Sequence, residues 1–185
     1  MKRITGLLAE SSSMYEKLSA YEFLEFVGAL YGVPGDVLRQ RADDLLKLFG
    51  LHERRDYLLE GYSRGMRQKV LIAAALVHDP PILFLDEPTS NLDPSAAHMV
   101  KDLIEQLTKR ADKTIFICSH ILPIMEEMCD RIGIINRGKL VALGTVDEII
   151  AQTGADDLEG AYIAMTGGAE EKDLLAWREQ GIVGP

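Results

Sequence analysis

The run Ile82-Leu83-Phe84-Leu85 is followed directly by Asp86, Glu87 and Pro88, and this junction most constrains the fold of the chain. Four apolar residues predict a buried strand, and the proline predicts that the strand stops there. Two carboxylates at the end of a core strand lose solvation unless a cation or hydrogen-bond donors compensate them. A magnesium-bound nucleotide supplies such compensation, so the junction predicts a phosphate-handling site.

The segments after this junction alternate between strand-like and helix-like patterns. We expect a helix opened by Asp93-Pro94, a strand at 114–118, a helix at 121–128, a hairpin across Asn136-Arg137-Gly138 and a helix at 145–152. Such alternation is typical of a parallel sheet with crossover helices. We therefore predict an α/β fold.

Before the junction the chain predicts one short strand and then mostly helix. The strand spans 4–8, and helices are expected from Ser19 to Tyr31, from 37 to 49 and from Ser63 to Val77. Ser19 with Glu22, and later Thr145 with Glu148, have the spacing of capping boxes. After residue 155, helical pieces are expected at 158–165 and 173–179.

Composition narrows the class of protein. The 185 residues are 47% hydrophobic and 26% charged, which is globular rather than disordered. A formal net charge of -9 argues against a surface built for nucleic acid or anionic lipid. The apolar runs are far shorter than the ~20 residues of a membrane helix. Cys118 and Cys129 lie in or beside apolar segments, so we expect buried, reduced thiols.

Residues 82–93 resemble the Walker B motif and D-loop of the ATP-binding-cassette (ABC) ATPases almost letter for letter. The resemblance implies that Asp86 holds Mg²⁺ and that Glu87 orients and deprotonates the attacking water. Asp93 ends the D-loop stretch and is assigned with the nucleotide-binding residues. One aspartate is chemically sufficient, because Mg²⁺ prefers few carboxylates together with phosphate oxygens and water.

A second stretch, Tyr62 to Lys69, partly resembles the signature loop of the same family, usually written LSGGQ. Ser63 and Gly65 match its serine and second glycine, whereas Arg64 and Met66 depart from it. Gln68 lies two positions beyond the usual glutamine, so that role is not moved onto it. In the family this loop grips the γ-phosphate of ATP held by the opposite subunit of a dimer.

Two single residues complete the resemblance. His120 matches the switch histidine that contacts the γ-phosphate, and the order signature, Walker B, D-loop, histidine is that of the family. Glu10 occupies the Q-loop position, where the family normally has glutamine; a carboxylate there can reach Mg²⁺ or water but cannot donate as an amide does.

The phosphate-cradling motif G-x-x-x-x-G-K-S/T does not occur in the 185 residues. The nearest match ends at Gly138-Lys139-Leu140, which lacks the hydroxyl residue and falls in the predicted hairpin. The family comparison implies an ABC ATPase fold of the P-loop NTPase type, truncated at its N-terminus. The expected boundaries are 1–155 for the partial domain, with a helical subdomain at 19–77 and the catalytic core remainder at 82–155, and 156–185 for a helical tail. The missing strand normally lies beside the strand that leads to His120, so its absence predicts an unpaired edge, marginal folding and weak ATP binding.

The resemblance implies an ATP-hydrolysing subunit of an ABC transporter, with composite sites in a dimer, a membrane-spanning permease as partner, and a place at the inner face of the cell membrane. ATP and Mg²⁺ are the implied cofactors, no nucleic-acid partner is expected, and the form of the signature favours export. One alternative is a soluble ABC ATPase acting on DNA or ribosomes, which normally carries a coiled-coil insertion or a second cassette; neither is found here. The other is a non-catalytic module that completes the ATP site of a partner cassette.

Overall fold

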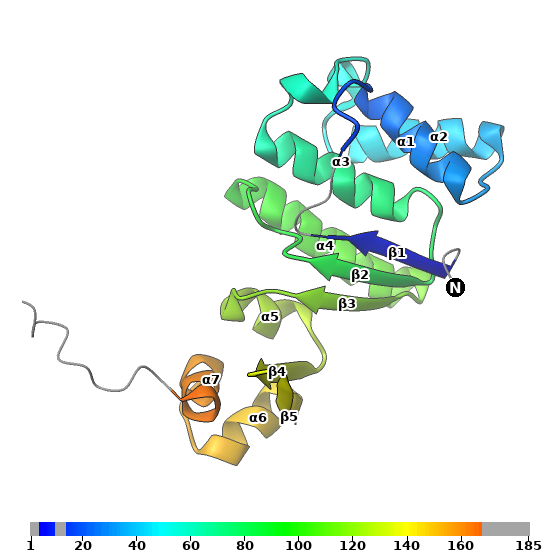
Figure 1. Ribbon diagram of the computed structural model, residues 1–185. Helices are drawn as coiled ribbons and strands as arrows, with labels where there is room; N and C mark the ends of the chain where they lie inside the picture. Colours follow the sequence, from blue (N-terminus) through cyan, green and yellow to red (C-terminus); the bar gives the residue numbers. More distant parts are fainter. Residues whose placement is uncertain (1–3, 10–13, 168–185) are drawn as a thin grey trace, which may run out of the picture. The chain divides into compact units, whose positions relative to one another are not determined.

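The computed structural model describes residues 4–9 and 14–167, and the chain divides into two compact units, Met1–His120 and Ile121–Pro185 (Figure 1). The elements of the first unit are β1 (Thr5–Leu8), α1 (Ala20–Leu30), α2 (Gly35–Leu48), the short 3-10 helices η2 (His52–Arg54) and η3 (Leu59–Gly61), α3 (Arg64–Leu76), β2 (Ile82–Asp86), α4 (Pro94–Ala111) and β3 (Thr114–Cys118). Those of the second unit are α5 (Leu122–Met128), β4 (Ile132–Asn136), β5 (Lys139–Gly144), α6 (Val146–Thr153) and α7 (Leu158–Thr166).

A three-stranded parallel sheet in the order β1-β2-β3 forms the base of the first unit. Because side chains alternate across a sheet, Leu83 and Leu85 of the central strand point to one face and are buried. Helix α3 packs closely on β1, where a Cβ at Gly6 would lie 2.3 Å from the carbonyl oxygen of Ala75. Helix α4, in the same unit, contacts β3. Both helices are seen beside the sheet in Figure 1.

Within the first unit, no described element covers the opposite face of this sheet. Leu7, Phe84 and Phe116 are in register on the three strands and are 64%, 41% and 56% exposed. The rings of Phe84 and Phe116 stack with centroids 5.2 Å apart. In the described part of the chain, β3 pairs with β2 and ends the sheet. The sheet therefore has one packed face and one bare apolar face.

Helices α1, α2 and α3 lie between β1 and β2 in the sequence, and they pack against one another as a separate layer. Leu24, Leu46, Leu59 and Val70 are fully buried in it. Helix α1 begins at a capping box in which Ser19 accepts from the Glu22 amide and Glu22 accepts from the Ser19 amide. Helix α2 ends at Leu48, and Gly50 follows with a positive φ of 67°. The predicted helical region is confirmed.

The second unit is an antiparallel hairpin packed on helices. Arg137 and Gly138 connect β4 to β5 with positive φ angles of 48° and 75°, as a two-residue hairpin turn requires. Thr145 and Glu148 form the predicted capping box of α6. The core consists of Ile132, Ile134, Ala142, Ile149, Leu158 and Ala161. Gly138-Lys139 thus lies in a hairpin, not in a phosphate-binding loop, and the helix predicted at 173–179 lies outside the described residues.

One prediction about the cysteines is wrong. Both thiols are free, but Cys118 is exposed and only Cys129 is partly buried. Cys118 is the last residue of β3 and shares the bare face with Phe84 and Phe116, so its apolar neighbours in sequence do not bury it. No helix in the described part of the chain is long and apolar enough to span a membrane.

Candidate functional site

The carboxyl ends of β2 and β3 place the predicted catalytic residues together. Asp86 is opposite Cys118 in the parallel register, so Glu87 lies beside Ser119 and His120. The Glu87 amide donates to the Cys118 carbonyl at 2.9 Å, which continues the pairing one residue beyond β2. Ligands of open α/β sheets bind at this edge.

The Glu87 side chain is held by three hydrogen-bonding groups. Its Oε1 accepts from the backbone amide of His120 at 2.9 Å and lies 2.7 Å from His120 Nδ1, and its Oε2 accepts from Ser119 Oγ at 3.0 Å. The Glu87 side chain is 14% exposed, whereas that of His120 is 82% exposed. The largely buried Glu87 carboxylate thus contacts the exposed imidazole of His120.

The surroundings of Glu87 keep it ionised. Burial alone raises the pKa of a carboxyl group, but the hydrogen bonds from His120 and Ser119 favour the charged form and together lower the Glu87 pKa below its ordinary value. At neutral pH this side chain is therefore a hydrogen-bond acceptor, able to orient a water molecule and to receive its proton in a transition state.

Asp86 ends β2 and is partly exposed. Its carboxylate is a hard oxygen donor of the kind that Mg²⁺ prefers, and Mg²⁺ takes its other ligands from phosphate and water. No cluster of three or more histidine, cysteine, aspartate or glutamate side chains suited to a metal occurs within residues 4–9 and 14–167. The single carboxylate of Asp86 is of the donor type that could hold Mg²⁺ together with phosphate and water oxygens.

The signature stretch forms the start of α3. Ser63 is exposed and caps the helix, accepting from the Met66 amide at 3.3 Å. Gly65 lies against the loop after Glu87, because a Cβ there would be 2.9 Å from the Asn91 carbonyl oxygen. An exposed serine beside the free amides of a helix N-terminus can bind an anion.

Asp93 caps the next helix of the site. Its Oδ1 accepts from the Ala96 amide at 3.0 Å, and this hydrogen bond lowers the Asp93 pKa. The side chain thus has a structural task at the start of α4, beside the nucleotide role assigned to it by resemblance. Glu10 lies outside the described residues.

Two participants were not predicted from the sequence. Ser119 donates to Glu87, and Gln68 donates from α3 to the carbonyl oxygens of Glu87 and Pro88 at 3.1 and 3.3 Å. The position of Ser119, between a predicted strand and His120, was an available signal. Gln68 had none, because its contact depends on how α3 docks on the loop after β2.

Comparisons with known proteins show which family this chain resembles. A family model described as ABC transporter matches residues 1–90. The ABC transporter ATP-binding protein NatA of Bacillus subtilis is 36% identical over 165 residues, which are 89% of this chain and 66% of NatA. The daunorubicin/doxorubicin resistance ATP-binding protein DrrA of Streptomyces peucetius is 35% identical over 176 residues, 95% of this chain and 53% of DrrA. An uncharacterized ABC transporter ATP-binding protein of Nostoc sp. is 41% identical over 86% of this chain and 48% of its own length.

Solved structures show the same relationship. The ATP-binding subunit of an ABC transporter matches with a TM-score of 0.82 and 32% identity, over 89% of this chain and 69% of the other. The ATP-binding cassette MJ0796, solved as a dimer in a post-hydrolysis state bound to ADP and Pi, matches with a TM-score of 0.70 and 25% identity, over 76% of this chain and 62% of that one. The chain spans between about half and two thirds of the curated relatives named above. It has the α/β fold of the ABC ATPases and belongs to the family of ABC transporter ATP-binding proteins.

Proposed function

We propose that this chain contributes to ATP hydrolysis as part of an ABC transporter ATP-binding subunit. The observation that carries the proposal is the Glu87 carboxylate, held by Ser119 and His120 at the carboxyl edge of a parallel sheet and adjacent to Asp86. This arrangement suits the activation of a water molecule beside a magnesium-bound phosphate.

In the proposed reaction Glu87 orients the attacking water and accepts its proton. The water oxygen forms a bond to the γ-phosphorus, the bond from that phosphorus to the bridging oxygen breaks, and ADP leaves with the electron pair. His120 contacts the γ-phosphate from its exposed position, and Ser119 keeps Glu87 in place. Asp86 would hold Mg²⁺, which would neutralise phosphate charge when bound.

The residues of the signature stretch act on a second subunit in this proposal. Ser63 and Gly65 of one subunit meet the nucleotide of the other, so that a dimer has two composite sites. Asp93, at the end of the D-loop, and Glu10 complete the nucleotide contacts. The region α1 to α3 contacts a membrane-spanning permease, which places the protein at the cytoplasmic face of the membrane.

Export is the proposed direction. Several relatives have names that state resistance or export: DrrA for daunorubicin and doxorubicin, LnrL of Bacillus subtilis for linearmycin, and a Mycobacterium tuberculosis protein for fluoroquinolones. The transported substrate of this chain is not part of the proposal, because its described residues contain no permease surface that would select it.

We propose further that the chain by itself holds ATP weakly, since its 185 residues contain no G-x-x-x-x-G-K-S/T segment. A second function follows from the same observation. Ser63 and the N-terminus of α3 are exposed and capped, so the chain could complete the ATP site of an intact partner cassette without binding nucleotide itself.

ATP turnover on mixing tests the catalytic proposal. The chain is mixed with an intact ABC cassette, and phosphate release is compared for wild type, Glu87→Gln and Glu53→Gln; Glu53 is the control because its side chain is 97% exposed and far from the site in sequence. ATP is supplied well above the weak Kd expected for the chain, so that the site containing Glu87 is occupied. If Glu87 is the base, the turnover added by the chain then falls at least ~100-fold in Glu87→Gln and is unchanged in Glu53→Gln. Added turnover that survives Glu87→Gln but is lost in Ser63→Ala supports the complementing module, and no added turnover at all contradicts both functions.

A further inference from the structure

Gln68 connects the helix of the signature stretch to the backbone of the catalytic carboxylate. It lies in the second turn of α3, and its Nε2 donates to the carbonyl oxygen of Glu87 at 3.1 Å and to that of Pro88 at 3.3 Å. Both contacts join groups that are 19 and 20 residues apart in sequence. The amide therefore binds two consecutive carbonyl groups at the point where β2 turns into the following loop.

The backbone at this point needs such support. Glu87 has a φ of 48°, in the left-handed region that residues with a Cβ seldom occupy. Such a conformation persists only when neighbouring contacts enforce it. For Glu87 these contacts are three hydrogen bonds. The Glu87 amide donates to the Cys118 carbonyl oxygen, and the Glu87 carbonyl oxygen accepts from the Ser90 amide at 3.1 Å and from the Gln68 side chain.

The direction of the Glu87 side chain depends on this conformation. A rotation of its backbone toward the extended region would turn the Cβ away from Ser119 and His120, and the contacts of 2.7 to 3.0 Å would be lost. The same helix also approaches the same loop closely four residues further on, because a Cβ at Gly65 would lie 2.9 Å from the Asn91 carbonyl oxygen. The start of α3 and the loop after β2 are thus packed closely together at two points.

We propose that Gln68 is a positioning residue, which holds the Glu87 carboxylate against His120 by fixing the backbone of Glu87 and Pro88. The inference rests on the proposed function in one respect, since it takes Glu87 as the catalytic base. It adds a coupling, because Ser63 and Gly65 at the start of the same helix are assigned to the nucleotide of the opposite subunit. A displacement of α3 by nucleotide in one composite site then alters the carboxylate of the other.

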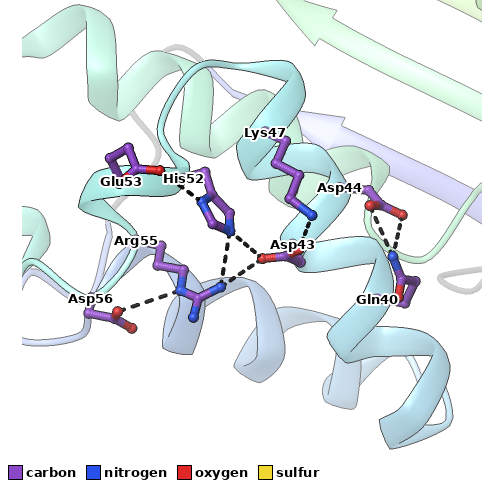
Figure 2. A network of polar contacts seen from close by, with 8 residues as sticks. All are labelled: Gln40, Asp43, Asp44, Lys47, His52, Glu53, Arg55 and Asp56. Atoms are coloured by element: carbon purple, nitrogen blue, oxygen red, sulfur yellow. Dashed lines mark hydrogen bonds and ion pairs between the residues drawn. The ribbon is translucent and has the colours of Figure 1, made fainter.

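The first test removes the donor and retains the volume. Gln68→Met is nearly isosteric and has no N–H group, and Gln40→Met is its matched control, because Gln40 donates its side-chain amide to Asp44 on the exposed surface of α2 (Figure 2). Amide hydrogen exchange is measured by NMR on the whole chain. The His120 amide, which donates to Glu87 Oε1, reports on the carboxylate, and the amides of β2 report on the fold.

Loss of one hydrogen bond predicts exchange of the His120 amide about five to ten times faster in Gln68→Met, with the β2 amides unchanged and Gln40→Met like wild type. The ring ¹⁵N shifts of His120 should move in the same variant, since its Nδ1 loses the Glu87 partner. Unchanged His120 exchange and ring shifts in Gln68→Met would overturn the inference. Faster exchange spread evenly over β2 and His120 would also overturn it, because Gln68 would then only stabilise the fold.

A kinetic test separates this inference from the proposed function. In the mixing assay, Gln68→Met should lower kcat about tenfold and leave KM for ATP unchanged, because the carboxylate is misplaced and the nucleotide contacts are intact. A change in KM alone would contradict positioning. If Glu87→Gln leaves turnover unaffected, the proposed function fails, and the exchange experiment still decides whether Gln68 positions Glu87.

Discussion

The helical region α1 to α3 and the sheet β1 to β3 belong to the same unit but differ in how completely they are packed. In the helical region Leu24, Leu46 and Leu59 are fully buried by neighbouring helices. In the sheet, Leu7, Phe84 and Phe116 are 41% to 64% exposed across the three strands. The helices bury their own apolar faces, whereas the described sheet buries one of its two faces.

Polar contacts follow the same division. On the outside of the helical region, Asp43 of α2 accepts from Arg55 Nη1 at 2.8 Å, lies 2.9 Å from His52 Nε2 and pairs with Lys47 (Figure 2). Arg55 also accepts at its carbonyl oxygen from the Tyr21 amide of α1. This network connects α2, η2 and α1.

The helical region and the sheet therefore differ in what they need in order to fold. Helices that bury one stripe against each other form a core by themselves, whereas parallel sheets are stable when both faces are covered. We therefore expect the helical region to account for most of the measured stability of this chain, and the sheet to depend on further cover.

The largest effect is expected from a cavity in the helical region. Leu24→Ala removes a fully buried side chain and should lower the free energy of unfolding by about 2–5 kcal/mol. Phe84→Ala removes a larger side chain that is 41% exposed and should cost about 1 kcal/mol or less. Urea unfolding followed by circular dichroism measures both, and equal costs would remove the contrast.

A smaller effect is expected where α3 meets the loop after β2. Gly65→Ala places a Cβ 2.9 Å from the Asn91 carbonyl oxygen, and the required shift should cost about 1–3 kcal/mol, more than the helix gains from alanine. Gly61→Ala is the matched control, because no atom lies within 4 Å of its Cβ. If the two variants unfold at the same urea concentration, α3 is not fixed to this loop as described.

The smallest effect concerns the junction between the two regions, at His78. Its ring stacks on Tyr31 at the end of α1, its Nε2 donates to the Thr5 carbonyl oxygen of β1 at 3.0 Å, and its Nδ1 is buried without a partner among the described residues. Burial is the main cause that lowers the His78 pKa below 6.5. The unfolded chain therefore binds a proton that the folded chain excludes, so stability should fall as pH decreases below 6.5.

Thermal unfolding between pH 7.5 and 5 measures this dependence. His78→Phe keeps the ring stack and should flatten the profile, and His98→Gln, at a 70% exposed side chain of α4, should leave it as in wild type. A profile in wild type that is already flat, or that is unaltered by His78→Phe, would show that His78 does not link the two regions through its charge.

The sequence predicted those features whose signals are local. These features depend on residues no more than about four positions apart. They are the capping boxes at Ser19 and Thr145, the turn at Gly138 and the helix opened by Asp93-Pro94, and all are present. Glu87 and His120 were each predicted as site residues, and the parallel register of β2 and β3 brings them into contact. Ser119, which donates a further hydrogen bond to Glu87, was not predicted.

The features that escaped prediction depend on packing between distant segments. Gln68 reaches Glu87 only because α3 docks beside the loop after β2, and no spacing in the sequence reports this. The burial of Cys118 was inferred from its apolar neighbours, but exposure depends on what covers the sheet face. Hydrophobicity states which residues favour burial, and the tertiary arrangement determines which of them achieve it.

The central proposal is that Glu87 is the hydrolytic carboxylate of an ABC ATP site and that the 185 residues, which contain no G-x-x-x-x-G-K-S/T motif, hold ATP weakly by themselves. Isothermal titration calorimetry of the isolated chain with ATP and Mg²⁺ tests it most directly. We expect a Kd weaker than about 1 mM, which corresponds to a binding free energy of roughly -4 kcal/mol or less in magnitude. Saturable binding at micromolar ATP, together with a single cooperative unfolding transition raised by the nucleotide, would contradict it.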